Sequence, residues 1–196
     1  MVRVALFASG NGSNVENIYK VFDGQTRIKF PLLVSNQEDA RVVKRAELYK
    51  KNIQIISKRT LLEPTVYAFI DFLKQEQIDW IILAGFLLKI PSALIQAFPS
   101  RIINIHPSLL PRFGGQGMYG LNVHKAAIAS GERSTGITIH LVDDEYDHGP
   151  ELASRKVPVL KGDTPEVLAE RVQAAEPEFY VEILGKLADG TLAWPR

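Results

Sequence analysis

The fold is decided near the start of the chain, where residues 2–14 read VRVALFASGNGSN. The stretch Val2–Ala8 is mostly apolar and runs into Gly10 and Gly12, so we expect a buried strand there. Asn14–Phe22 follows with apolar side chains at helical spacing. A strand, a glycine loop and a helix in this order predict the first unit of an α/β fold.

The alternation of strands and helices continues to about residue 130. We expect strands at Phe30–Val34, Ile53–Ile56, Trp80–Ala84 and Ile102–His106, and helices at Ala40–Lys51, Pro64–Gln75 and Val123–Ser130. This order predicts an α/β fold with a doubly wound, mostly parallel, Rossmann-like sheet and helices on both faces.

After residue 130 the pattern changes. Gly136–Val142 and Glu151–Val159 have the composition of strands but no helix between them, so we expect an antiparallel C-terminal extension of the sheet. Thr164 is a good N-cap for a final helix that reaches Leu187, with a break or kink at Pro177. The chain has 196 residues and no linker, so we expect one domain over residues 1–196.

The composition excludes several classes of protein. The chain has no cysteine, which rules out disulfides, thiolate nucleophiles and cysteine-based metal sites. Its net charge is +1 and its basic residues are scattered, whereas a nucleic-acid partner needs a concentrated basic face. The longest apolar run, Trp80–Leu88, falls far short of the ~20 residues that span a membrane. The first residues lack the pattern of a signal peptide, so we expect a cytoplasmic protein that binds neither nucleic acid nor membrane.

The first chemical motif is the loop Ser9–Asn14, between the first strand and the first helix. Its glycines let the backbone approach a ligand, and the free N–H groups of the helix start favour an anion. The dinucleotide fingerprint needs a third glycine where this chain has Val15, and an acid where it has Ser35 and Asn36. We therefore predict a monophosphate site rather than an NAD or ATP site. The alternative is a capped turn without a ligand.

The second motif is NIHPSLLP over residues 104–111, at the carboxyl end of the fifth strand. Asn104 and His106 are two residues apart, so both side chains point to the same side of the sheet. An amide donor beside an imidazole suits a reaction in which a carbonyl oxygen becomes an oxyanion. A core histidine without a chemical role is the alternative.

The third motif is DDEYDHGP over residues 143–150. An acidic run can be a solvated loop, and the alternating pattern of a calcium loop is absent. The functional interpretation is that one carboxylate orients and charges His106. Between the second and third motifs, the glycine-rich segment 112–122 predicts a flexible loop.

In this order and spacing the motifs resemble those of the folate-dependent formyltransferases, most of all the branch that acts on glycinamide ribonucleotide in purine biosynthesis. The resemblance covers nearly the whole chain. It is carried by Gly10–Asn14, Ala84–Phe86, Asn104–Pro111, Asp147–Pro150 and Arg171–Glu176.

The resemblance implies direct transfer of the formyl group of 10-formyltetrahydrofolate to the amine of glycinamide ribonucleotide, with no metal and no covalent intermediate. Three residues would be catalytic. Asn104 would bond the formyl oxygen, His106 would manage protons, and Asp147 would keep His106 charged and help relay protons. No metal ligands are implied.

The resemblance also implies binding residues, with the ribonucleotide in the N-terminal half and the folate in the C-terminal half. The substrate phosphate would be held by Gly12, Ser13 and Asn14. The folate would be held by Leu87, Leu88, Lys89, Ile90, Asn104, Asp143, Asp144, Tyr146 and Asp147. The ribose and amine would face Gln173 and Glu176. The family pattern further implies a cis peptide at Leu110–Pro111, and the chain is expected to be a monomer or homodimer.

Some positions depart from the family pattern. Leu88-Lys89 replaces a more usual Arg-Ile, and the glycine-rich loop is longer than in the short forms, so substrate contacts there cannot be carried over. The family's arginine near the third strand has no certain match, although Arg59 is nearby. We interpret His148 as a loop residue. His140 is expected to be a supporting or structural residue, and His124 a residue of a helix start.

Two kinds of alternative function remain. One is another 10-formyltetrahydrofolate enzyme. A tRNA formyltransferase domain is expected to come with a further domain and a basic surface. A formylfolate hydrolase is expected to carry an extra domain at its amino end, whereas here the first strand begins at Val2. A non-catalytic nucleotide-binding module would share the fold but would not need Asn104, His106 and Asp147 together.

Overall fold

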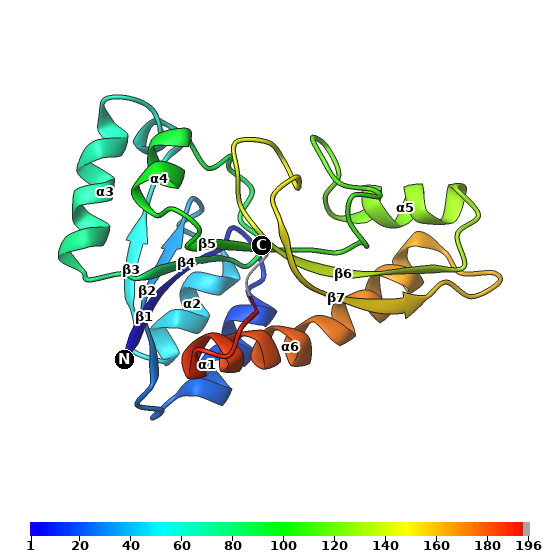
Figure 1. Ribbon diagram of the computed structural model, residues 1–196, viewed down its shortest axis with the longest axis horizontal. Helices are drawn as coiled ribbons and strands as arrows, with labels where there is room; N and C mark the ends of the chain where they lie inside the picture. Colours follow the sequence, from blue (N-terminus) through cyan, green and yellow to red (C-terminus); the bar gives the residue numbers. More distant parts are fainter. Residues whose placement is uncertain (194–196) are drawn as a thin grey trace.

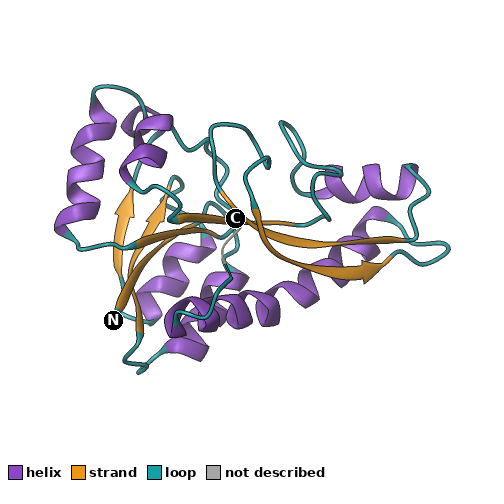
Figure 2. Ribbon diagram, viewed as in Figure 1, coloured by secondary structure: helices purple, strands orange, loops and turns teal. Residues whose placement is uncertain are grey.

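The computed structural model describes residues 1–193, which form one seven-stranded sheet with helices packed against it (Figures 1 and 2). The last three residues of the expected domain 1–196 lie outside the described residues. The strands are β1 (Val2–Phe7), β2 (Ile28–Ser35), β3 (Asn52–Ile55), β4 (Trp80–Leu83), β5 (Ile102–His106), β6 (Ser134–Leu141) and β7 (Glu151–Pro158). The helices are α1 (Ser13–Phe22), α2 (Arg41–Leu48), α3 (Thr65–Gln75), α4 (Ser92–Ala97), α5 (Leu121–Ala129) and α6 (Pro165–Asp189), with a 3₁₀ turn η1 (Lys58–Leu61).

The strand order is β3-β2-β1-β4-β5-β6-β7. Strands β1 to β5 pair in parallel, whereas β6 is antiparallel to both β5 and β7. The doubly wound sheet with an antiparallel extension is therefore confirmed. The order reverses between β1 and β4, and in open α/β sheets such a reversal leaves a crevice at the carboxyl ends of the strands.

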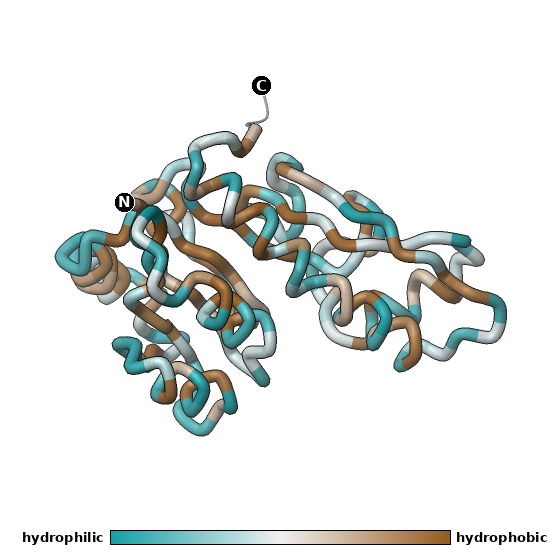
Figure 3. The backbone as a smooth tube through the Cα atoms, turned by 90° about the horizontal axis from the view of Figure 1, so that it is seen from below, coloured by the Kyte–Doolittle hydropathy of each residue, from teal (hydrophilic) through white to brown (hydrophobic). Residues whose placement is uncertain are grey.

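Two apolar layers cover the sheet, and β1 shows how the sequence produces them. Val4 and Leu6 belong to the core cluster that includes α1, α2 and α6, while Ala5 and Phe7 belong to the cluster that includes α3 and α4. Successive strand side chains point to opposite faces, so one apolar strand serves both layers. Figure 3 shows the apolar segments running through the sheet and the hydrophilic ones gathered at the turns.

The structure differs from the expected elements in three places. The helix α4 and the turn η1 were not expected, because six and four residues are too short to show a period. The last helix is not broken at Pro177, since α6 runs continuously to Asp189, while a kink at Pro177 stays a prediction. Its first turn agrees with the prediction, because the Thr164 side chain accepts a hydrogen bond from the N–H of Val167. Among the described helices, none combines the length and apolarity that crossing a membrane requires.

Candidate active site

A cavity of about 660 Å³ opens where β1, β4 and β5 end. Fourteen of the residues that the sequence predicts for the site line it: Gly12, Ser13, Asn14, Leu87, Leu88, Lys89, Ile90, Asn104, His106, Asp143, Tyr146, Asp147, Gln173 and Glu176. The reversal of strand order thus brings together motifs that lie up to 164 positions apart, from Gly12 to Glu176. Asp144 is the one predicted residue that does not line the cavity, because its carboxylate turns to the hydroxyl of Ser92.

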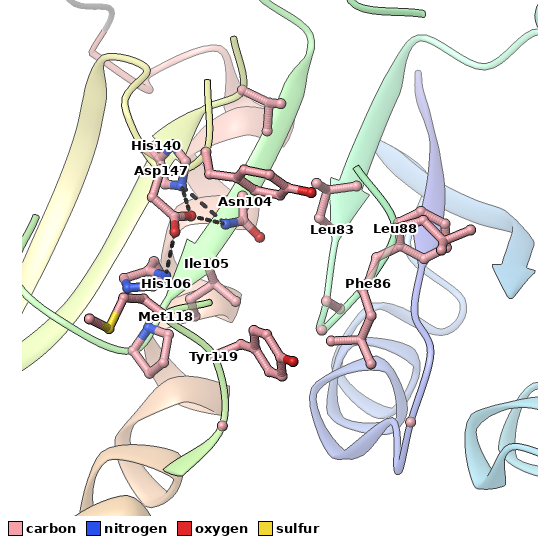
Figure 4. Close-up of a pocket in the computed structure, with 18 of the residues that line it drawn as sticks. Leu83, Phe86, Leu88, Asn104, Ile105, His106, Met118, Tyr119, His140 and Asp147 are labelled. Atoms are coloured by element: carbon pink, nitrogen blue, oxygen red, sulfur yellow. Dashed lines mark hydrogen bonds and ion pairs between the residues drawn. The ribbon is translucent and has the colours of Figure 1, made fainter. Parts of the chain in front are cut away.

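Asn104 and His106 occupy β5 and both line the cavity, as the two-residue spacing predicts (Figure 4). The His106 ring is buried, with only 3% of its surface exposed. Its Nε2 lies 2.8 Å from the carbonyl oxygen of Phe113, and its Nδ1 lies 3.3 Å from Oδ2 of Asp147. A carbonyl and a carboxylate both accept hydrogen bonds, so this arrangement suits the doubly protonated imidazolium.

Asp147 reaches the pair from the loop between β6 and β7. Its φ of 56° is a left-handed conformation, which aspartate tolerates better than most residues. Besides His106, its Oδ2 accepts the N–H of Gly115 at 3.0 Å, and its Oδ1 accepts Nδ2 of Asn104 at 3.4 Å. The carboxylate therefore joins both β5 side chains to the start of the glycine-rich loop.

The electrostatics of Asp147 favour its charged form. Burial would raise its pKa, but the hydrogen bond and charge of His106, the neighbouring His140 and the N–H of Gly115 together outweigh that effect. The pKa of Asp147 therefore lies well below its ordinary value. The group stays a carboxylate at neutral pH and can balance a cationic His106.

His140 supports Asn104 from β6, where the two residues face each other in the antiparallel register. Its Nδ1 lies 2.8 Å from the carbonyl oxygen of Leu141, so that nitrogen carries the proton. Its Nε2 lies 3.1 Å from Nδ2 of Asn104 and can accept from it, whereas Asp147 at 3.6 Å is too far for a hydrogen bond. His140 therefore fixes the orientation of the Asn104 amide, which agrees with a supporting residue.

At the other end of the cavity, Gly12, Ser13 and Asn14 form the start of α1, whose free N–H groups face an approaching anion. Gly12 is required for a reason that the motif did not reveal. Its φ is 73°, and a Cβ there would lie 2.4 Å from Cγ2 of Val42 in α2. The missing side chain of Gly12 thus permits close packing of the α1 start against α2.

Glu176 of α6 closes this end of the cavity. Its Oε2 accepts Nδ2 of Asn14 at 2.7 Å. Burial raises the pKa of Glu176, although the hydrogen bond from Asn14 and the charge of His106 act in the opposite direction. Oδ1 of Asn14 is buried and has no partner within the described part of the chain. An amide oxygen in that position is available to accept a hydrogen bond from a ligand.

The segment Leu87–Ile90 and the loop with Asp143 and Tyr146 form the opposite wall. Lys89 lies over the Tyr146 ring, with Nζ 5.5 Å from its centroid. The segment is tied to the loop that follows β1, because the N–H of Leu87 donates to the Ser9 hydroxyl at 2.9 Å.

The structure also assigns places to the remaining singled-out residues. Arg59 lies in η1 and does not line the cavity. His148 is an exposed loop residue near Asp143, as expected. His124 lies in the first turn of α5 but lines the cavity; burial, and then the charge of His106, lower its pKa. The Leu110–Pro111 peptide is cis, as the family pattern implies.

Sequence reasoning missed one set of lining residues, the segment 115–120 of the glycine-rich loop. It contributes Met118 and Tyr119, which Figure 4 places beside Ile105 and His106. The signal in the sequence was the aromatic Tyr119 between Gly117 and Gly120. An aromatic side chain in a glycine-rich loop does not pack into the core, so it is a candidate for contact with a ligand.

A family model described as Formyl transferase matches residues 2–184. The chain belongs to the formyl transferase family. Among curated proteins, it is 41% identical over 198 residues to the chloroplastic phosphoribosylglycinamide formyltransferase of Arabidopsis thaliana, covering 98% of this chain and 67% of the relative. It is 33% identical over 190 residues to the phosphoribosylglycinamide formyltransferase of Bacillus subtilis (strain 168), covering 95% of each.

Solved structures of the formyl transferase family show the same fold. The crystal structure of glycinamide ribonucleotide transformylase 1 from Symbiobacterium toebii superposes with a TM-score of 0.88 at 31% identity, covering all of this chain and 91% of that one. The chain spans about two thirds of its Arabidopsis relative and nearly all of the bacterial proteins.

Proposed function

We infer that this formyl transferase moves the formyl group of 10-formyltetrahydrofolate onto the amine of glycinamide ribonucleotide, the reaction for which its relatives are named. The observation that carries the inference is the cluster of Asn104, His106 and Asp147 at the centre of the cavity. A hydrogen-bonded imidazole and amide beside a partly buried carboxylate suit the tetrahedral oxyanion of acyl transfer. The reaction is one step of de novo purine biosynthesis.

The proposed mechanism is direct transfer. The substrate amine attacks the formyl carbon, a C–N bond forms, and the carbonyl oxygen becomes an oxyanion. The oxyanion accepts hydrogen bonds from Nδ2 of Asn104, whose contact with Asp147 is long at 3.4 Å, and from the His106 imidazolium. The bond to the folate nitrogen then breaks, and the proton lost by the amine reaches that nitrogen through Asp147 or water.

The binding assignments follow the two ends of the cavity. The α1 start, Gly12–Asn14, takes the substrate phosphate, and Gln173 and Glu176 take the ribose and amine. The wall Leu87–Ile90 and the loop residues Asp143, Tyr146 and Asp147 take the folate. Asp144 supports that loop through Ser92 and does not touch the folate directly. We propose that residues 1–196 act as one domain with these two halves.

The test is an absorbance assay that follows the conversion of 10-formyltetrahydrofolate to tetrahydrofolate. We expect conversion with glycinamide ribonucleotide, none with water alone, and no loss of rate after exhaustive chelation. Conversion without the ribonucleotide would indicate a formylfolate hydrolase. Conversion only with an aminoacylated tRNA would indicate a tRNA formyltransferase domain, and no conversion at all a non-catalytic nucleotide-binding module. Chelator-sensitive activity restored by zinc or magnesium would contradict metal-free transfer.

The small-molecule substrates suit the family, while the cytoplasmic location and the monomeric or homodimeric state stay predictions. The Arabidopsis relative is named as chloroplastic, so relatives work in more than one compartment. Cell fractionation and light scattering on the purified chain test the two predictions.

A further inference from the structure

The ribonucleotide end of the cavity has donors but no permanent cation. Among the described residues that line the cavity, Lys89 is the single lysine or arginine, and it lies over Tyr146 on the folate wall. The α1 start therefore offers a phosphate neutral donors: backbone N–H groups, the Ser13 hydroxyl and the side-chain amide of Asn11. A phosphate dianion has three strong acceptor oxygens, so it has room for a further side-chain donor beside these groups.

Tyr119 of the glycine-rich loop is a candidate for this further donor. Tyr119 lines the cavity and yet is 61% exposed. Figure 4 shows its ring standing in the cavity, with the hydroxyl directed toward the loop that precedes α1. Within the described part of the chain, that hydroxyl makes no hydrogen bond. An exposed ring and an unused donor at a substrate cavity indicate a contact that forms with the substrate.

The loop is built to hold Tyr119 in this place. Gly115, Gly117 and Gly120 have positive φ, and a Cβ on any of them would meet nothing within 4 Å. Glycine is therefore favoured there by the backbone conformation and not by a lack of space for a side chain. The loop is anchored to the catalytic cluster by the N–H of Gly115 on Asp147. On its other side, the Asn122 side chain donates to the Gly117 carbonyl at 3.1 Å.

We propose that Tyr119 is a specificity residue for the phosphorylated substrate, its hydroxyl donating a hydrogen bond to the phosphate held at the α1 start. The proposal rests on the proposed function. It gives the long loop a role: the loop carries a donor to the phosphate, and its first residues hold Asp147 and the His106 ring. Discrimination arises because a substrate without the phosphate leaves this donor unused.

The test compares two substrates, glycinamide ribonucleotide and the corresponding riboside without the phosphate. For Tyr119→Phe we expect kcat/KM to fall about tenfold with the ribonucleotide and to stay unchanged with the riboside, because a hydrogen bond to a charged group is lost. The KM for 10-formyltetrahydrofolate should not change. Tyr67→Phe is the matched control: Tyr67 is an exposed tyrosine of α3 outside the cavity, hydrogen-bonded to Glu63, and its loss should leave both substrates unaffected.

The outcomes separate this proposal from the function on which it rests. If the wild type uses the ribonucleotide but Tyr119→Phe keeps the wild-type preference for it, the phosphate contact is refuted and the function stands. A rise only in the KM for the folate would likewise refute it, by placing the ring against the other substrate. If the wild type converts neither compound, the proposed function fails and this inference fails with it.

Discussion

At the scale of single residues, the two glycines of the first loop have different roles. Gly12 has a positive φ and packs against Val42, whereas a Cβ on Gly10 would meet nothing within 4 Å. We expect Gly12→Ala to lower the free energy of unfolding by about 2 to 4 kcal/mol, from the left-handed backbone and the clash. Gly10→Ala should change it by less than about 0.5 kcal/mol. Urea unfolding measures both, and equal stability of the two variants would contradict the packing argument.

The catalytic pair of His106 and Asp147 makes a second prediction at this scale. His106→Ala and Asp147→Asn should each lower kcat by about two to four orders of magnitude, the usual effect of a positioned acid–base group. The double variant should be little worse than the worse single one, because members of one catalytic unit are not additive. Steady-state kinetics and circular dichroism on all three variants test this. Losses that multiply would mean that the two residues act independently.

These residues also show what the sequence could predict about the site. The motifs predicted Asn104, His106 and Asp147. The reaction limits which residue types can act, and the ends of the strands limit where such residues can lie. They did not give the contact of Gly12 with Val42 or the turn of Asp144 toward Ser92, since both depend on the packing of elements distant in sequence. Tyr119 was missed because the loop has no period, and the three-dimensional path alone places it in the cavity.

At the scale of elements, α6 shows why Pro177 does not break the helix that contains it. Pro177 lacks the N–H that would bond to the Gln173 carbonyl, but burial of Val172 and Phe179 on either side holds the helix together. The Tyr180 hydroxyl also donates to the carbonyl of Leu83 at 2.6 Å, which joins α6 to the end of β4. The spacing of apolar residues and their helix or strand propensity predicted the long elements well. Tertiary packing, in contrast, decided the continuity of α6 at Pro177 and the presence of the short helix α4.

The link from α6 to β4 can be tested. Tyr180→Phe removes a fully buried hydroxyl and leaves the Leu83 carbonyl without that donor, so the free energy of unfolding should fall by about 1 to 3 kcal/mol. Tyr67→Phe removes an exposed hydroxyl and should cost less than about 0.5 kcal/mol. Thermal or urea unfolding compares the two variants. A Tyr180→Phe protein as stable as Tyr67→Phe would mean that this bond does not hold the helix on the sheet.

At the scale of the whole molecule, two partly buried carboxyl groups, Asp147 and Glu176, make stability depend on pH in opposite directions. The pKa of Asp147 is lowered in the folded state, so its contribution is complete above the unfolded pKa of about 3.9 and is lost as the pH falls below it. The pKa of Glu176 is raised by burial, so the folded state binds its proton more tightly and stability falls as the pH rises above about 4.3. The summed contribution of Asp147 and Glu176 to the free energy of unfolding is therefore largest near pH 4.

The last prediction isolates the Asp147 part of this dependence. The unfolding free energy of the wild type minus that of Asp147→Asn should rise with pH up to about pH 4, by at most about 1.4 kcal/mol per pH unit, and then level off before histidine titrates. Taking the difference cancels Glu176 and the surface carboxyl groups. In a His106→Ala background the rise should be smaller, because one of the interactions that lower the pKa of Asp147 is gone. Urea unfolding between pH 2.5 and 5 measures both curves. A flat wild-type difference would show that the pair of His106 and Asp147 does not form in solution. An equal rise in both backgrounds would instead assign the effect to the other groups around the carboxylate, His140 and the N–H of Gly115.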